Sequence, residues 1–311
     1  MPDLQRDLQR DPQDGPLVGH VAIIGLGLMG GSLGLALRAD DGCGRLAGVV
    51  VGYDITPDVT QRAVARGALD RASGSLADAV IAADLVVIAT PTLAAEATLR
   101  AMAEHLAPDV VVTDLCSVKT PLVELASLTL QHPQRFVGGH PMAGRERAGI
   151  EAAIPDLYRG ARWALTPTPQ TAPDALSRVR ALVVALGAEP LELAAEAHDA
   201  AVAGISHLPL ALAVALTRTL AESDDWPTMA LLAAGGYRDT TRVAAGDPVM
   251  GRDILLANRE ALLARLDAFA ETLARLRAMV AHGDAIEIEA ALREAQRALL
   301  AWEVSRQHRA T

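Results

Sequence analysis

The 311-residue sequence contains little cysteine and almost no lysine. Cys43 and Cys116 are its only cysteines, too few for a disulfide framework and without the spacing of a metal site, so we expect no metal. Lys119 is the single lysine, and the other 27 basic residues are arginines. A composition so biased toward arginine hints that this lysine has a specific task, although a solvent-facing residue at a helix start remains an alternative.

Clusters of basic residues are also missing. The formal net charge is −10, which makes the chain a poor candidate for binding the phosphate backbone of a nucleic acid. The content of 51% hydrophobic residues argues against a disordered chain. An acidic protein that handles an anionic substrate must concentrate positive charge locally, so individual arginines matter more than the total.

The sequence has no apolar signal core in its first twenty residues, and we interpret residues 1–15 as a loose tail. Its most apolar charge-free stretch, residues 200–217, is shorter than the ~20 residues that a membrane span needs, and it includes Ser206, His207 and Pro209. We therefore expect a helix buried between subunits or domains, no membrane segment and a cytoplasmic protein.

Continuous β-branched runs alternate with helical segments over the first part of the chain, a pattern typical of a parallel sheet covered on both faces. The predicted fold is a Rossmann-type doubly wound α/β domain over residues 16–193, followed by an all-helical domain over residues 194–311 for substrate binding and dimerisation. The expected strands are residues 20–24, 49–54, 85–89, 110–113, 162–165 and 190–193.

A glycine-rich motif follows the first strand and opens a helix, which is the context that dinucleotide binding requires. Gly25 permits a tight turn, Gly27 lets the backbone approach a pyrophosphate, and Gly30 allows close packing of helix and strand. The helix start offers unpaired N–H groups and a positive dipole end to the phosphates. The predicted cofactor-binding residues of this motif are Gly25, Leu26, Gly27, Leu28, Met29 and Gly30.

Further residues extend the predicted cofactor site. Asp54 ends the second strand, where an acid hydrogen-bonds the ribose hydroxyls, and no arginine follows it directly, so NAD is favoured over the phosphorylated cofactor. Thr90 and Pro91 end the third strand and are predicted to line the cleft. A capping role for Asp54, and a plain turn at Thr90, remain alternatives.

Two segments carry candidate chemistry at the carboxyl edge of the sheet. Ser117 and Lys119 follow the fourth strand. His140 stands among glycines and a proline, which we interpret as irregular backbone with an exposed imidazole suited to acid–base work. A structural histidine is the alternative.

The helical half carries His207, in Ser206-His207-Leu208-Pro209, and a glycine turn that leads into a helix with Arg238 and Arg242. Arginines four residues apart share a helix face, and guanidinium groups bind carboxylates well. A solvated charged face, and a buried hydrogen-bonded histidine, remain alternatives.

Together these segments resemble prephenate dehydrogenase over nearly the whole chain. The likeness rests on ordered motifs at matching separations, from the glycine motif to the helix after Asp247. Its specific parts are Ser117-Val118-Lys119, Gly139-His140-Pro141-Met142-Ala143-Gly144, Ser206-His207-Leu208-Pro209 and Arg238-Asp239-Thr240-Thr241-Arg242.

The resemblance implies NAD-dependent oxidative decarboxylation of prephenate to 4-hydroxyphenylpyruvate in tyrosine biosynthesis, by a homodimer. His140 matches the base that takes the hydroxyl proton, Ser117 a serine that aligns the reacting groups, and His207 a second active-site histidine. Arg242, with Arg238 beside it, matches the carboxylate-binding segment. Glu146 matches an acid that joins an ionic network with the substrate arginine and gates the pocket.

The sequence departs from the family pattern at Cys116, usually glycine, at Arg145, commonly Ser or Thr, and at Gly251, often tryptophan. We interpret Cys116 as a tolerated small residue, whereas Arg145 and Gly251 put the gate and the aromatic packing in doubt. The short segment after the helical region leaves no room for the regulatory ACT domain of some relatives.

Three other functions stay open. Arogenate dehydrogenase shares these motifs and differs in the side chain it accepts. The glycine motif also resembles β-hydroxyacid dehydrogenases, but those rely on a lysine in the helical region, and no lysine follows Lys119. A non-catalytic NAD-sensing protein is the third alternative.

Overall fold

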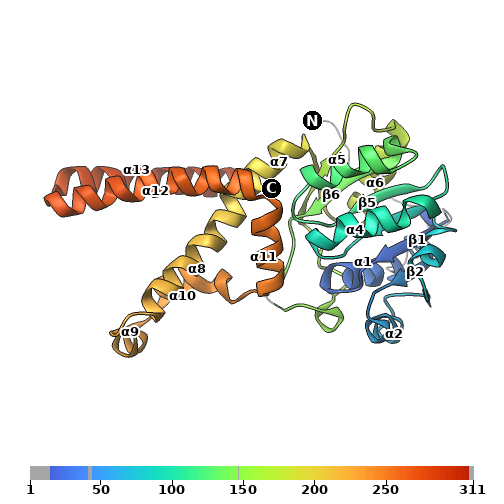
Figure 1. Ribbon diagram of the computed structural model, residues 1–311, viewed down its shortest axis with the longest axis horizontal. Helices are drawn as coiled ribbons and strands as arrows, with labels where there is room; N and C mark the ends of the chain where they lie inside the picture. The colour runs from blue at the N-terminus through green and yellow to red at the C-terminus, as the bar shows by residue number, and fades with distance from the viewer. Residues whose placement is uncertain (1–14, 41–43, 146, 308–311) are drawn as a thin grey trace. The chain divides into compact units, whose positions relative to one another are not determined.

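The computed structural model describes residues 15–40, 44–145 and 147–307 (Figure 1). The chain forms two compact units, Met1–Arg259 and Glu260–Thr311. Within the described residues, the first unit holds one eight-stranded sheet with its covering helices and a further set of helices. The second consists of two long helical segments.

The sheet has the strand order β3-β2-β1-β4-β5-β6-β7-β8, and all neighbours are parallel except the antiparallel pair β6 and β7. The order reverses between β1 and β4, and open α/β sheets bind ligands at such a switch point, outside the carboxyl ends of the strands. The strands are β1 (Val18–Ile24), β2 (Ala47–Tyr53), β3 (Arg71–Ala72), β4 (Leu85–Ile88), β5 (Val111–Asp114), β6 (Phe136–Pro141), β7 (Arg162–Thr166) and β8 (Glu189–Glu192).

Helices cover both faces of the sheet and form two separate cores. One core includes side chains of α1 (Leu28–Arg38), α2 (Pro57–Ala65) and α6 (Pro173–Ala185). The other includes side chains of α3 (Leu76–Val80), α4 (Thr92–Met102) and α5 (Thr120–Thr129). Short 3₁₀ turns occupy η1 (Ala103–His105), η2 (Pro133–Arg135) and η3 (Ile150–Ala152). The central strands are therefore buried on both sides, as their β-branched composition predicts.

The predicted Rossmann-type sheet followed by a helical region is confirmed, and all six expected strands are present within a residue or two. The short edge strand β3 was not expected. The interpretation of residues 138–144 as irregular backbone is wrong for the first half of that segment, because His140 lies within β6 and pairs with Ala164 of β7. The imidazole of His140 is also not fully exposed, in contrast to the expectation from the sequence, because the residue is half-buried.

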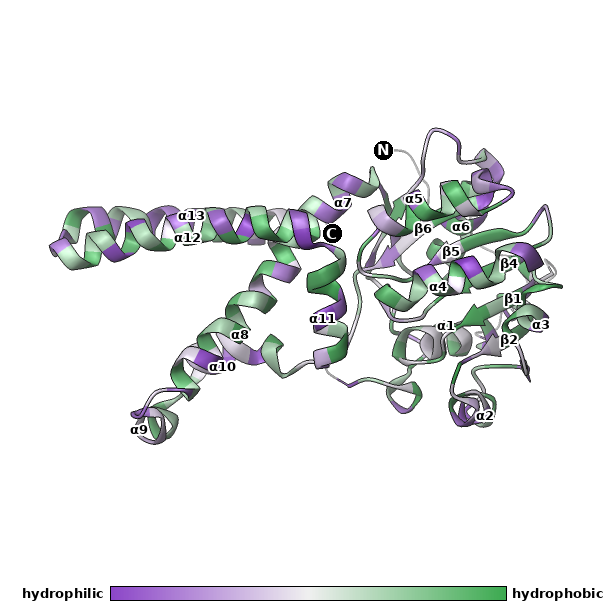
Figure 2. Ribbon diagram, in the orientation of Figure 1, coloured by the Kyte–Doolittle hydropathy of each residue, from purple (hydrophilic) through white to green (hydrophobic). Residues whose placement is uncertain are grey.

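The helices after the sheet begin with a continuous run, α7 (Ala195–Val202), the π-turn η4 (Ala203–His207) and α8 (Leu208–Ala221). By length and composition, the stretch Ala195–Ala221 could cross a membrane, and 22% of its apolar window is buried in this structure. It is followed by α9 (Trp226–Leu232), α10 (Gly235–Thr241), η5 (Arg242–Ala245) and α11 (Pro248–Ala257). Hydrophobic residues predominate along α8 (Figure 2).

The final segments are α12 (Arg259–His282) and α13 (Ala285–Gln307), which are joined by a short turn. Hydrophobic and hydrophilic residues alternate along both (Figure 2). Several large apolar side chains on these helices are exposed, including Val280, Ile286, Leu292 and Trp302. Exposed apolar surface of this kind typically marks an interaction site.

Candidate functional site

The turn after β1 brings α1 against the switch point of the sheet. Gly25 has a φ of +96°, and a Cβ atom there would lie 2.7 Å from the backbone of Ala89 and Thr90. A Cβ on Gly30 would lie 1.9 Å from the carbonyl oxygen of Gly25. Gly27 differs, because a Cβ there would meet nothing within 4 Å. Gly25 and Gly30 therefore allow close backbone packing, while Gly27 leaves open space in front of the start of α1.

Asp54 holds the glycine turn from the neighbouring strand. Its Oδ2 accepts a hydrogen bond from the backbone N–H of Leu26 at 2.9 Å, and its Oδ1 accepts one from Thr56 at 2.9 Å. At the end of β4, the hydroxyl oxygen of Thr90 is buried and has no hydrogen-bond partner within the described residues. Pro91 follows it as the residue before α4.

The single lysine is buried at the carboxyl edge of the sheet. The side chain of Lys119 has 0% exposure, forms an ion pair with Asp114 and donates to the carbonyl oxygen of Gly139 at 2.6 Å. Asp114 also accepts hydrogen bonds from the backbone N–H groups of Cys116 and Gly139, at 2.9 and 3.1 Å. The solvent-facing alternative for Lys119 is therefore wrong, and the pair fastens the end of β5 to β6 beside His140.

His140 is linked to the helical region through His198. Nδ1 of His140 lies 2.8 Å from Nε2 of His198, and the rings meet edge to face with centroids 5.0 Å apart. Nδ1 of His198 lies 2.8 Å from Oδ1 of Asp199. The Asp199 carboxylate also accepts the backbone N–H groups of Lys119 and Thr120, each at 2.8 Å. One carboxylate thus joins α7 to the start of α5.

His207 is held in the same network from the π-turn. The side-chain nitrogen of Asn258 donates to the carbonyl oxygen of Asp199 at 2.8 Å and lies 3.1 Å from Nδ1 of His207. Since this amide nitrogen is a donor, Nδ1 of His207 accepts and the proton of the neutral ring resides on Nε2.

The surroundings of His140 and His207 favour the neutral form of both rings. Burial, and then the charge of Lys119, lower the pKa of His140 well below its usual value. Burial lowers the pKa of His207 to about 4. Burial alone would raise the pKa of Asp199, but hydrogen bonds from His198, Thr120 and Lys119 outweigh it and the pKa is lowered. The site therefore combines an ionised acid with neutral imidazoles.

The other predicted site residues lie at several places. Ser117 is half-buried in the loop between β5 and α5. Arg238 lies in α10, where it pairs with Asp239 at 3.0 Å. Arg242 begins η5, just beyond the end of α10, so the expectation that the two arginines share one α-helix is wrong. Gly235 and Gly236 were expected to precede the helix, but they form the first turn of α10. Glu146 lies outside the described residues.

The departures from the family pattern also have definite environments. Burial raises the pKa of the Cys116 thiol, so a reactive thiolate is disfavoured there. Arg145 donates to the carbonyl oxygen of Ala152 at 3.4 Å. Gly251 lies in α11, where a Cβ would contact the side chain of Leu210 at 3.7 Å.

Comparisons with known proteins identify the family of this chain. The family model described as "Prephenate dehydrogenase, nucleotide-binding domain" matches residues 33–191, and "Prephenate dehydrogenase, dimerization domain" matches residues 194–294. The chain belongs to the prephenate dehydrogenase family. The family is one of oxidoreductases, and it includes proteins named prephenate, cyclohexadienyl and arogenate dehydrogenases.

Three members of the family are similar to this chain over at least 71% of their own length. A prephenate dehydrogenase of Bacillus subtilis (strain 168) is 34% identical over 267 residues, which cover 85% of this chain and 71% of that protein. The solved prephenate dehydrogenase from A. aeolicus, in complex with hydroxyphenyl propionate and NAD+, is 32% identical with a TM-score of 0.82, covering 91% of this chain and 98% of that one. A Synechocystis arogenate dehydrogenase is 31% identical with a TM-score of 0.78, covering 91% and 99%.

Three residues of the network were missed by reasoning from the sequence. His198, Asp199 and Asn258 stand on helical patterns without glycine or proline signals, and Asn258 is 59 positions from the carbonyl that it contacts. Only the adjacency of His198 and Asp199 is visible in the sequence, and it does not reveal their partners.

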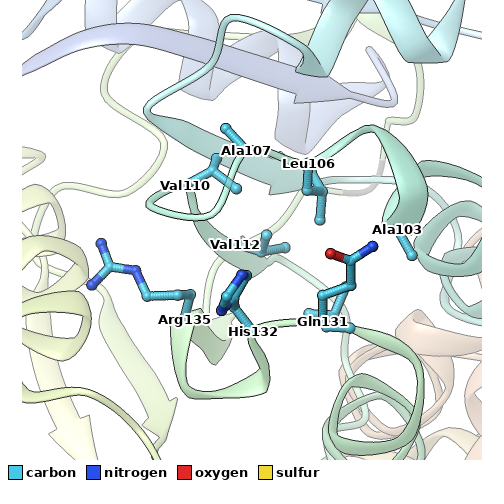
Figure 3. Close-up of a pocket in the computed structure, with 9 residues that line it drawn as sticks. Ala103, Leu106, Ala107, Val110, Val112, Gln131, His132 and Arg135 are labelled. Carbon is cyan, nitrogen blue, oxygen red and sulfur yellow. The ribbon is translucent and has the colours of Figure 1, made fainter.

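The pocket drawn in Figure 3 belongs to a different part of the sheet. It lies before the amino ends of β5 and β6, the edge opposite to His140, and its volume of about 20 Å³ has room for roughly one water. Its lining residues are Ala103, Leu106, Ala107, Val110, Val112, Leu130, Gln131, His132 and Arg135. It is too small for a substrate.

The buried pair predicts a large stability effect. Lys119→Met leaves the Asp114 carboxylate buried without its counter-charge, and we expect the free energy of unfolding to fall by about 3–5 kcal/mol in urea titrations. The control is Arg180→Met, which breaks a partly exposed pair with Glu192 and should cost at most about 1 kcal/mol. Equal losses in the two variants would contradict the role assigned to the buried pair.

Proposed function

We propose that this protein catalyses the NAD-dependent oxidative decarboxylation of prephenate to 4-hydroxyphenylpyruvate in tyrosine biosynthesis. The observation that carries the proposal is the placement of a neutral imidazole, His140, at the carboxyl edge of a Rossmann-type sheet in a chain of this family. Such a base meets the need of a hydroxyl oxidation, because the hydroxyl proton must leave as the carbon is oxidised.

The residues at the switch point fit NAD. The open space at Gly27, the turn closed by Gly25 and the start of α1 suit a pyrophosphate. Asp54 suits the ribose. The Thr90 hydroxyl at the end of β4 has no hydrogen-bond partner among the described residues, and we propose that it bonds to the bound cofactor. When bound, NAD supplies the acceptor for the hydride.

The remaining steps belong to the chain's own residues. His140 takes the proton of the ring hydroxyl at Nε2, while Ser117 aligns the hydroxyl. Loss of the ring carboxylate as carbon dioxide then aromatises the ring, and the proton returns to the phenol oxygen. His207, with its proton on Nε2, donates a hydrogen bond into the site. Arg242, Arg238 and Glu146 are proposed to bind and enclose the dianionic substrate.

Prephenate is proposed over arogenate because the Bacillus subtilis relative carries that name and matches 85% of this chain. The β-hydroxyacid alternative requires a lysine in the helical region, and the single lysine is buried in an ion pair at β5. A non-catalytic NAD-sensing protein would not use a base tuned to the neutral form. Parallel initial-rate assays of NAD reduction with prephenate and arogenate decide the substrate, and a higher kcat/KM with arogenate would overturn our choice.

Replacement of the base tests the catalytic assignment. We expect His140→Asn to lower kcat by roughly 10²–10⁴-fold while KM for prephenate changes little, since only proton transfer is lost. His105→Asn, at an exposed histidine of η1, serves as the control and should keep the wild-type kcat. Wild-type turnover by the His140 variant would refute the assignment.

The depressed pKa of His140 predicts the pH dependence. The base form persists to lower pH when the pKa is lowered, and activity is lost only as the pH falls through that lowered value. We expect kcat/KM to stay level through the ordinary histidine pKa of about 6.5 and to fall at more acidic pH. An acid limb centred at or above the ordinary value would show that His140 is not the base in this form.

We also propose a homodimer formed through the helical domain, residues 194–311, separate from the nucleotide-binding domain at residues 16–193. The dimerization-domain match and the exposed apolar residues of α8, α9 and α13 support it, among them Val214, Leu231 and Ile286. Light scattering at micromolar concentration should give twice the mass of the chain, and a monomer would exclude the dimer.

A soluble cytoplasmic protein is part of the same proposal. The apolar stretch Ala195–Ala221 contains His198, Asp199 and His207, which are hydrogen-bonded to other parts of the first unit, and this argues against a membrane span. Recovery of the protein in the membrane pellet after cell fractionation would contradict this location.

A further inference from the structure

A line of three side chains runs from α7 to the candidate base on β6. The Asp199 carboxylate contacts Nδ1 of His198, and Nε2 of His198 contacts Nδ1 of His140, each at 2.8 Å. His198 and Asp199 are buried, whereas His140 is half-buried. The line therefore begins inside the protein and ends at the ring that faces the candidate site.

The direction of the two hydrogen bonds follows from the acid. Asp199 is anchored by the backbone N–H groups of Lys119 and Thr120, and its lowered pKa keeps it ionised, so it can only accept. His198 must then carry its proton on Nδ1. In the neutral ring this leaves Nε2 of His198 as an acceptor.

The second hydrogen bond fixes the tautomer of His140. Because Nε2 of His198 accepts, Nδ1 of His140 must donate and carries the ring proton. Within the described residues Nε2 of His140 has no hydrogen-bond partner. The lone pair of the base is therefore held on the nitrogen that is free to meet a substrate hydroxyl.

We propose that His198 and Asp199 are positioning residues that fix His140 as the Nδ1–H tautomer and stabilise the positive charge that its ring gains during proton transfer. The proposal rests on the proposed role of His140 as the base. The same arrangement, an acid that orients an imidazole and stabilises the imidazolium, is known from hydrolase triads. Here a second imidazole lies between the acid and the base.

The charges around His140 give this line a measurable effect. Lys119 at the start of α5 and His198 and His207 from the helical region lower its pKa, whereas Asp199 raises it. Asp114 at the end of β5 is paired with Lys119. Asp199 is therefore the group that makes the His140 ring a stronger base, and loss of its charge should leave a weaker base.

His198→Leu removes the acceptor at Nδ1 of His140, and we expect kcat to fall by about 10²-fold or more with KM values near the wild type. His198→Gln should restore most of the rate, because its amide oxygen can accept from His140 while its NH₂ group donates to Asp199. Wild-type kcat in the leucine variant would overturn the proposal, and so would a glutamine variant as slow as the leucine one.

Asp199→Asn tests whether the charge of Asp199 stabilises the protonated ring of His140. The acid limb of kcat/KM should move to lower pH than in the wild type, and the plateau rate should fall, because the charge that raises the pKa of His140 is gone. Loss of folded protein alone would lower the rate without moving the limb. The control is Asp284→Asn, at a carboxylate that accepts the N–H of Glu287 at the start of α13, and it should change neither quantity.

Nitrogen NMR of ¹⁵N-histidine protein reads the tautomer directly and does not depend on the folding of the Asp199 variant. The signals of His140, assigned by their absence in His140→Asn, should show a protonated Nδ1 and a bare Nε2, and the His198→Leu variant should gain the Nε2–H form. A wild-type ring with its proton on Nε2 would refute the proposal.

The kinetic variants distinguish failure of the proposed function from failure of the positioning role. If His140→Asn remains active, the proposed function itself fails. If His140→Asn is inactive while the acid limb of Asp199→Asn is unmoved, only the positioning role fails.

Discussion

A single buried carboxylate that must stay hydrogen-bonded organises the site. Asp199 accepts two backbone N–H groups at the start of α5, one ring N–H from His198, and its own carbonyl oxygen accepts from Asn258. An ionised group without these partners would cost several kcal/mol to bury. The helix that carries it is therefore held against the sheet domain in one register, and His198 and His207 take their positions from that register.

The buried positive charge of Lys119 acts only on groups close to it. The only lysine forms an ion pair with Asp114, and its charge also lowers the pKa of His140. In a chain with a net charge of −10, the attraction of the proposed dianionic substrate must come from arginines. Arginine suits this task because its planar guanidinium binds carboxylates through two hydrogen bonds and stays charged at any working pH.

The sequence predicts the sheet domain well because its signals are local. Buried β-branched runs define β1, β2, β4 and β5, and the glycine turn needs only six consecutive residues. β6 was missed because Gly138, Gly139 and Pro141 have poor strand propensity, and the strand exists through pairing with β5 and β7. The contacts of His198 with His140 and of Asn258 with Asp199 could not be predicted from local sequence patterns either, because they join residues 58 and 59 positions apart.

The π-turn between α7 and α8 sets the direction in which His207 points. In a regular α-helix, residues 198 and 207 would be separated by about two and a half turns and would face opposite sides. The wider turn Ala203–His207 advances less per residue and rotates His207 back toward Asn258 and Asp199. The π-turn thus changes the direction of the side chains that follow it. As a result, two imidazoles from one continuous apolar helix lie in the same hydrogen-bonded network.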